Sequence, residues 1–120
     1  MGAVLIVEDD ALIARQLAEM LRDAGYEVAG PATNTSAAWP LVEARRDLIC
    51  AILDVNIGDN LVFPIAQVLT QRAIPILFAT ASPAEKVRAQ WPRHEVLQKP
   101  FDAADVLARV RALSRSALAA

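Results

Sequence analysis

The sequence predicts an α/β fold, a three-layer α/β/α sandwich around a five-stranded parallel sheet, in a single domain spanning residues 1–120. Short apolar runs rich in Val, Ile and Leu alternate with longer segments in which apolar residues recur at helical spacing. With 55% hydrophobic and 22% charged residues, the 120-residue chain can bury a substantial core. Parallel strands joined by right-handed helical crossovers favour the flavodoxin-like strand order 2-1-3-4-5.

The first predicted strand covers residues 3–7, a branched apolar run bounded by acids. A helix follows, because Asp10 can cap its first turn, an apolar stripe continues through it, and Gly25 is suited to end it. A second strand is predicted at residues 26–29, ended by Gly30 and Pro31.

The middle of the chain repeats this alternation. Residues 34–45 show helical spacing, with Pro40 expected to bend the helix. The continuous apolar run at residues 48–53 is typical of a parallel strand covered on both faces. A polar loop is expected at residues 54–60, and the remaining predicted elements are helices at 61–71, 84–91 and 102–116 and strands at 75–79 and 96–98.

Composition excludes several classes of function. The net charge of −2 gives no electrostatic footprint for nucleic acid. One cysteine, Cys50, and one histidine, His94, cannot form an internal disulfide or a Cys/His zinc site, so any metal must be held by oxygen. We expect Cys50 to be core packing and His94 to be a solvated loop residue. The apolar run at residues 3–7 is too short to span a membrane and lacks a basic leader, so we expect a cytoplasmic protein.

Polar residues follow most of the predicted strands. In a parallel sheet the carboxyl ends of the strands meet at one edge, where ligands bind near the switch in strand order. The order 2-1-3-4-5 makes the first and third strands neighbours, which would bring their acids together. The residues at this edge are Glu8, Asp9 and Asp10 after the first strand, Asp54 after the third, Thr80 after the fourth and Lys99 after the fifth.

Clustered carboxylates repel one another, and a hard divalent cation relieves the repulsion. Magnesium fits best, since it accepts carboxylates, a carbonyl and waters, and completes its shell with phosphate oxygens. Lys99 and Thr80 would add a positive charge and a hydroxyl, the groups that stabilise a phosphoryl group in transfer. A carboxylate nucleophile in such surroundings forms an aspartyl phosphate. The simpler alternative is a helix N-terminus that attracts acids through its dipole, and Asp10 is better interpreted as a cap than as a ligand.

Four motifs in order resemble the receiver domain of response regulators in bacterial two-component signalling, and the resemblance covers essentially the whole chain. They are Val-Leu-Ile-Val-Glu-Asp-Asp at residues 4–10, Ile-Leu-Asp-Val-Asn at 52–56, Phe-Ala-Thr-Ala at 78–81 and Gln-Lys-Pro-Phe at 98–101. The resemblance implies a phosphoacceptor in a phosphorelay. Its partners would be a sensor histidine kinase or a phosphotransfer protein, and an unknown downstream protein.

The resemblance also implies a role for each residue. Asp54 would accept the phosphoryl group. Thr80 would move toward that group and Lys99 would pair with it, with a cis bond between Lys99 and Pro100. The implied Mg²⁺ ligands are Glu8, largely through bound water, Asp9, Asp54 and the main-chain carbonyl of Asn56. The protein would catalyse only its own phosphorylation and dephosphorylation, and would not be an enzyme with an external substrate.

Two departures from the family pattern leave alternatives open. Val96 stands where receivers usually carry a switching Tyr or Phe, and Gly58 stands where proline is common. One alternative is therefore a degenerate receiver that binds partners without phosphorylation. A phosphatase with an aspartate nucleophile is the other, although the chain leaves no room for a substrate cap. Because the sequence stops soon after the last predicted helix, we expect action in trans, a relay, a phosphate sink or a piece of a longer regulator.

Overall fold

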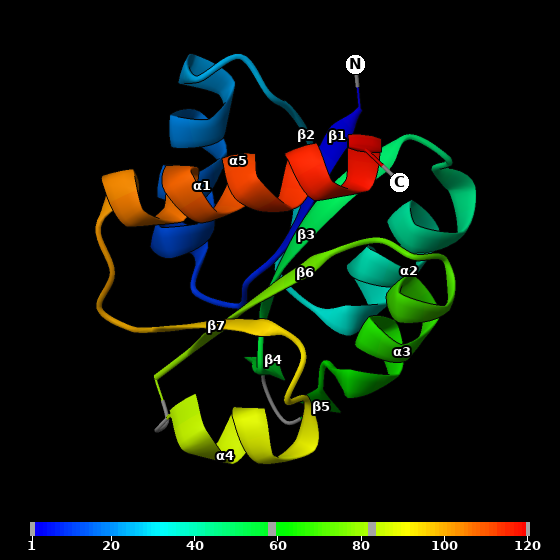
Figure 1. The fold of residues 1–120 in the computed structure, drawn as a ribbon, viewed down its shortest axis with the longest axis vertical. Coiled ribbons are helices and arrows are strands. Elements are labelled where there is room, and N and C mark those ends of the chain that lie inside the picture. Colours follow the sequence, from blue (N-terminus) through cyan, green and yellow to red (C-terminus); the bar gives the residue numbers. More distant parts are fainter. Residues whose placement is uncertain (1, 58–59, 82–83, 120) are drawn as a thin grey trace.

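Five parallel strands form one sheet in the order β2-β1-β3-β6-β7, which confirms the predicted 2-1-3-4-5 arrangement (Figure 1). The computed structural model describes residues 2–57, 60–81 and 84–119, except for the side chains of residues 56–57, 60–61 and 116–119. The strands of this sheet are β1 (Ala3–Val7), β2 (Glu27–Ala32), β3 (Leu48–Asp54), β6 (Ile76–Thr80) and β7 (Glu95–Gln98). The helices are α1 (Ala11–Asp23), α2 (Thr35–Ala44), α3 (Phe63–Gln71), α4 (Ala84–Gln90) and α5 (Ala103–Ala119).

Side chains alternate between the two faces of β1, and each face has its own core layer. Leu5 and Val7 pack with residues of α2, α3 and α4 on one face. Val4 and Ile6 pack with residues of α1 and α5 on the other. The three layers of the sandwich follow from this two-sided burial.

The first helix begins where the sequence predicts. The Asp10 side chain accepts hydrogen bonds from the backbone N–H groups of Leu12 and Ile13, at 3.0 and 3.1 Å. The capping residue lies three residues after the end of β1, and α1 begins at the next residue. It therefore keeps Glu8 and Asp9 in the short connection at the carboxyl end of the sheet.

The predicted end of the second strand is wrong, because β2 continues through Gly30 and Pro31 to Ala32. Only β1 pairs with β2, so Pro31 lies in an edge strand, where its missing N–H is tolerated. Gly30 has a φ of 96°, and a Cβ there would lie 2.7 Å from the Ala32 nitrogen. The pairing shifts register between Leu5 and Val7, beside this irregular segment.

The loop expected at residues 54–60 contains a small antiparallel hairpin of β4 (Asn56–Ile57) and β5 (Asn60–Leu61). Helix α3 then begins at Phe63 rather than at residue 61, with Pro64 in its first turn. The Val62 N–H donates to the Val55 carbonyl at 3.2 Å and closes the loop. This returning loop places the start of α3 near the end of β3.

No helix in the described part of the chain is both long and apolar enough to pass through a membrane.

Candidate functional site

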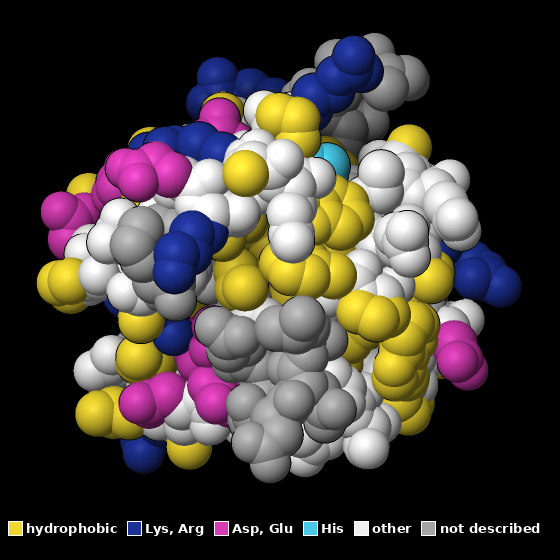
Figure 2. Space-filling view, turned by 90° about the horizontal axis from the view of Figure 1, so that it is seen from below, with side chains coloured by type: hydrophobic (Ala, Val, Ile, Leu, Met, Phe, Trp, Pro, Cys, Tyr) yellow, Lys and Arg dark blue, Asp and Glu magenta, His cyan; other side chains and the backbone are white. Residues whose placement is uncertain are grey.

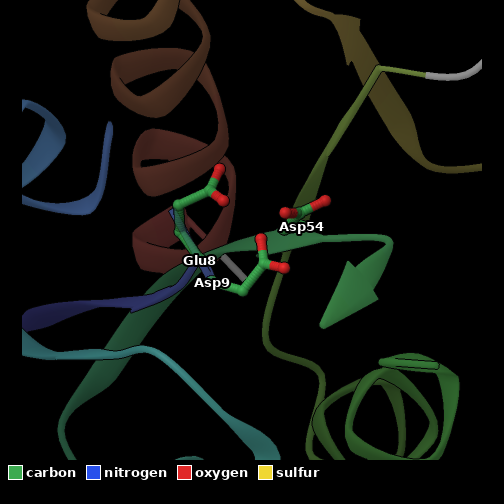
Figure 3. A group of neighbouring side chains, drawn as sticks. All are labelled: Glu8, Asp9 and Asp54. Carbon is green, nitrogen blue, oxygen red and sulfur yellow. The ribbon is translucent and has the colours of Figure 1, made fainter. Parts of the chain in front are cut away.

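Three carboxylates meet at the carboxyl ends of β1 and β3 (Figure 3). Val7 pairs with Leu53 in the sheet, so the residues that follow them leave adjacent strands side by side. Glu8, Asp9 and Asp54 each offer an oxygen, and these oxygens all lie within 4.8 Å of one another. The structure thus brings together the three acids that the strand order predicts to be neighbours.

The three acids differ in burial. Glu8 is 1% exposed and Asp54 is 6% exposed, whereas Asp9 lies open to solvent. The pKa of Asp54 is raised to about 7, first by burial and then by the neighbouring carboxylates of Glu8 and Asp9, against the smaller lowering by the Lys99 ammonium. Negative charge at Asp54 is therefore under-compensated by the protein alone.

Lys99 contributes the positive charge of the site. Its Nζ lies 2.6 Å from Glu8 Oε1 and 3.3 Å from Asp54 Oδ2, as an ion pair with each. Burial acts to lower the pKa of Lys99, but the contacts with Glu8 and Asp54 outweigh burial and raise it. Lys99 is therefore held as an ammonium between the two buried carboxylates. The bond between Lys99 and Pro100 is cis, as the resemblance implies.

Thr80 is fully buried at the end of β6, one residue beyond the partner of Asp54 in the sheet. Asp54 pairs with Ala79, and the Thr80 carbonyl accepts a hydrogen bond of 2.7 Å from the Lys99 N–H. Adjacent strands thus deliver the hydroxyl and the ammonium to the same edge as the acids.

The other residues singled out in the sequence have separate positions. Asp10 caps α1, and its N–H donates to Glu8 Oε2 at 3.0 Å, which fixes the buried carboxylate. The backbone of Asn56 lies in β4, two residues after Asp54, and its role as a carbonyl ligand stays a prediction. Gly58, which stands where proline is common in receivers, lies outside the described residues.

The donor set fits a hard divalent cation. Mg²⁺ prefers oxygen ligands and usually binds one or two carboxylates together with waters and phosphate oxygens. Among the described residues, three carboxylates within 4.8 Å face one ammonium, which leaves net negative charge in a half-buried site. Asp9 is open to solvent and so offers a direct ligand, whereas Glu8 is buried and already paired with Lys99.

A cluster of aromatic rings beside this edge is a feature that the sequence did not reveal. Trp91 stacks on Phe63 with ring centroids 5.7 Å apart, and its ring meets that of His94 edge-on at 5.1 Å. Phe78 lies within 6.0 Å of all three rings, measured between centroids. In Figure 2, hydrophobic side chains gather at the centre of this face with the histidine at their margin.

His94 lies in the loop before β7 as expected, but it is half-buried against this cluster rather than solvated. Burial lowers its pKa, and its Nε2 lies 3.4 Å from the Thr70 hydroxyl oxygen. Val96, where receivers usually carry an aromatic residue, is 3% exposed in the same core layer. The rings of Phe63, Phe78 and Trp91 fill this layer, and Val96 packs within it. Cys50, by contrast, is buried in the opposite layer as expected.

Comparison with known proteins gives consistent relatives. The family model described as the response regulator receiver domain matches residues 4–111. The transcriptional regulatory protein PdtaR of Mycobacterium tuberculosis is 35% identical over 119 residues, covering 93% of this chain and 57% of that protein. The phyllosphere-induced regulator PhyR of Methylorubrum extorquens is 32% identical over 108 residues, covering 88% of this chain and 40% of that protein. The chain thus spans about half the length of these relatives.

Solved structures agree with this assignment. The non-phosphorylated HemR receiver domain from Leptospira biflexa superposes with a TM-score of 0.79 at 28% identity, covering 95% of this chain and 94% of that one. A response regulator receiver protein from Sinorhizobium medicae gives a TM-score of 0.86 at 19% identity, covering 97% and 96%, which is a likeness of fold. With the motifs in place at the strand ends and the family model matched along nearly the whole chain, this protein belongs to the response regulator receiver domain family.

Proposed function

We propose that this receiver domain is a phosphoacceptor, in which Asp54 takes a phosphoryl group in an Mg²⁺-dependent step. The donor would be the phosphohistidine of a sensor histidine kinase or of a phosphotransfer protein. The position of the Asp54 carboxylate carries the proposal. It is 6% exposed, lies 3.3 Å from Lys99 Nζ, and has the oxygens of Glu8 and Asp9 within 4.8 Å.

In the proposed step an oxygen of Asp54 attacks phosphorus as the bond from phosphorus to the imidazole nitrogen of the donor breaks. The imidazole leaves, and the product is a mixed anhydride on Asp54. The Lys99 ammonium lies close enough to Asp54 to pair with a phosphoryl oxygen there. The Thr80 hydroxyl would hold a second oxygen. Hydrolysis of the anhydride by water returns Asp54 to its carboxylate.

The chain's own acids would hold the cation. Asp9 would bind it directly, Glu8 largely through water, and the Asn56 carbonyl would complete the protein ligands together with Asp54. When bound, Mg²⁺ supplies positive charge that offsets the repulsion between the phosphoryl oxygens and these carboxylates. Lys99 alone does not supply enough charge, because the pKa of Asp54 stays raised beside it.

The phosphorylated protein would pass its signal on in one of three ways. The protein would be modified stoichiometrically and would act on an unidentified protein in trans, relay the group onward, or serve as a phosphate sink. PdtaR carries the name of a transcriptional regulatory protein, but this chain spans 57% of it. We propose no direct contact with nucleic acid, and the cytoplasmic location stays a prediction.

The experiment that tests the proposal is intact-mass spectrometry after incubation with acetyl phosphate or phosphoramidate and Mg²⁺. The wild-type protein should gain one phosphoryl group, and EDTA or Asp54→Asn should abolish the gain. Asp23→Asn is the matched control, since Asp23 is exposed at the end of α1. An adduct that persists in Asp54→Asn would refute the assignment of the acceptor.

Two other outcomes would select the alternatives. Absence of an adduct, with Mg²⁺ binding shown separately and a candidate kinase also inactive, would favour an interaction module that works without phosphorylation. Sustained hydrolysis of an external phosphomonoester such as p-nitrophenyl phosphate would favour a phosphatase. Such a phosphatase also needs a segment that covers the substrate. The described helices and strands are those of the receiver sandwich and the β4–β5 hairpin, with no such cap among them, so we expect no turnover of an external phosphomonoester.

A further inference from the structure

A cavity of about 360 Å³ lies at the end of the sheet opposite Asp54. It is lined by residues that precede β1 and β2, by a residue near the start of β3, and by residues in the second half of α5. Tyr26 and Ile49 give it an apolar wall, and Gly25 lies beside them at the end of α1. Known ligand cavities of globular proteins are about 300–1,000 Å³, so this one has the size for a small molecule.

Two arginines at this cavity have no acidic partner among the residues that the structure describes. Arg111 and Arg115 both line it, and a spacing of four residues places them one turn apart on the same face of α5. No carboxylate in the described part of the chain lies within 4.0 Å of either guanidinium. Three arginines elsewhere in the described chain, Arg15, Arg45 and Arg109, do form ion pairs with acids. Two adjacent cations without a counter-charge favour an anion between them.

A buried hydroxyl at the same cavity has no hydrogen-bond partner. Ser114 lines the cavity and is 5% exposed, and its Oγ makes no hydrogen bond within the described residues. Such groups are uncommon in folded proteins, because a buried polar atom without a partner is unfavourable. A staggered rotation about its Cα–Cβ bond would let the hydroxyl donate to an acceptor in the cavity.

We propose that this cavity binds a small amphipathic anion with one or two fused rings and a single carboxylate or phosphate group. The rings lie against Tyr26 and Ile49, and the anionic group lies between Arg111 and Arg115. A ligand with rings alone or an anionic group alone would fit the site less well, because the cavity has an apolar wall and two arginines at its margin. The cavity shares no residue with the acidic site, so binding there can be measured without phosphorylation at Asp54.

The test uses the full chain labelled with ¹⁵N, in EDTA, and follows amide signals during titration with four probes. 2-Naphthoate and 2-naphthyl phosphate carry rings together with an anion, 2-naphthol carries the rings alone, and inorganic phosphate carries the anion alone. We expect saturable shifts at Gly25, Tyr26 and Ser114 with one or both ring-bearing anions. Affinity for 2-naphthol and for phosphate should be weaker by about tenfold or more. The naphthoate and naphthyl phosphate arms distinguish a carboxylate from a phosphate ligand.

Variants locate the binding. Arg111→Gln with Arg115→Gln should weaken the better probe by about tenfold or more, whereas Arg88→Gln with Arg93→Gln, exposed arginines elsewhere, should not. Ser114→Ala should weaken it by a factor of about three to ten. Shifts absent from the amides that line the cavity, equal affinity for 2-naphthol, or full affinity in the double Arg111 and Arg115 variant would each overturn the proposal.

Discussion

Replacing Asp54 with asparagine should stabilise the metal-free protein above neutral pH. The folded structure raises the pKa of this carboxyl to about 7, first by burial and then through Glu8 and Asp9. In the unfolded chain an aspartate has a pKa near ~3.9. The ionised form of Asp54 is thus less favourable in the folded protein than in the unfolded one, and an amide at this position removes that unfavourable charge.

The sign and size follow from linkage between proton binding and folding. Between about pH 4 and about pH 7 the folded protein keeps a proton that the unfolded chain releases, so the free energy of unfolding falls as pH rises. A pKa difference of about three corresponds to ~4 kcal/mol, which is an upper limit. Asparagine also removes the ion pair of Asp54 with Lys99 Nζ. We therefore expect a net gain of about 1–3 kcal/mol near pH 8.

The assay is urea unfolding in EDTA, followed by far-ultraviolet circular dichroism at several pH values from about 5 to about 8. The advantage of Asp54→Asn over wild type should shrink as the pH is lowered through this range. The control Asp23→Asn should show a difference from wild type that does not change with pH, because Asp23 is exposed. An Asp54→Asn protein no more stable than wild type near pH 8, or a gain independent of pH, would refute the reasoning.

Three further predictions concern the metal, the scaffold and the rate of hydrolysis. Mg²⁺ should raise the melting temperature of wild type more near pH 8 than near pH 6, because Asp54 must release its proton before it can bind the cation. In the same thermal unfolding assay Asp9→Asn should remove most of this increase, and an unchanged response in that variant would contradict the assignment of Asp9 as a ligand. Arg72→Ala should lower the free energy of unfolding, measured in urea, by about 1–3 kcal/mol, because the Arg72 guanidinium donates to the Val42 and Arg45 carbonyls at 2.5 and 2.6 Å. A decrease too small to measure would show that water replaces the guanidinium at these carbonyls. Asn56→Ala should change the lifetime of the phosphoryl adduct more than its yield, followed by mass spectrometry over time, and unchanged decay would exclude a role for Asn56 in admitting water.

The strands in the middle of the sheet could be predicted because their signal is local and redundant. Residues 3–7 and 48–53 are continuous apolar runs, as expected of strands covered on both faces, and β1 and β3 match these ranges to within one residue. The end of β2 could not be predicted in this way. Gly30 and Pro31 are local turn signals, and what permits them in a strand is the position of β2 at the edge of the sheet.

The acidic site was predictable for a topological reason. Once the order 2-1-3-4-5 is assumed, Glu8, Asp9 and Asp54 must follow adjacent strands, and no side-chain detail is needed to bring them together. Their unequal burial was not predictable. It depends on the cap at Asp10, whose N–H holds the Glu8 carboxylate, and on the reach of Lys99 across the sheet edge.

Features built from several chain segments escaped sequence reasoning. The rings of Phe63, Phe78, Trp91 and His94 come from a helix start, a strand and a loop, so no periodic pattern connects them. The hairpin of β4 and β5 has strands of two residues each, too short for an alternation to be visible. Both features depend on tertiary packing, which overrides local propensity.

The central claim is that Asp54 is the residue that accepts a phosphoryl group. The most direct measurement treats the protein with acetyl phosphate and Mg²⁺, reduces the acyl phosphate with borohydride, and maps the product by peptide mass spectrometry. Reduction of an aspartyl phosphate gives homoserine, so the account predicts homoserine at position 54 and at no other aspartate, and none when EDTA is present. Homoserine at Asp9 or Asp10 with an intact Asp54 would contradict it.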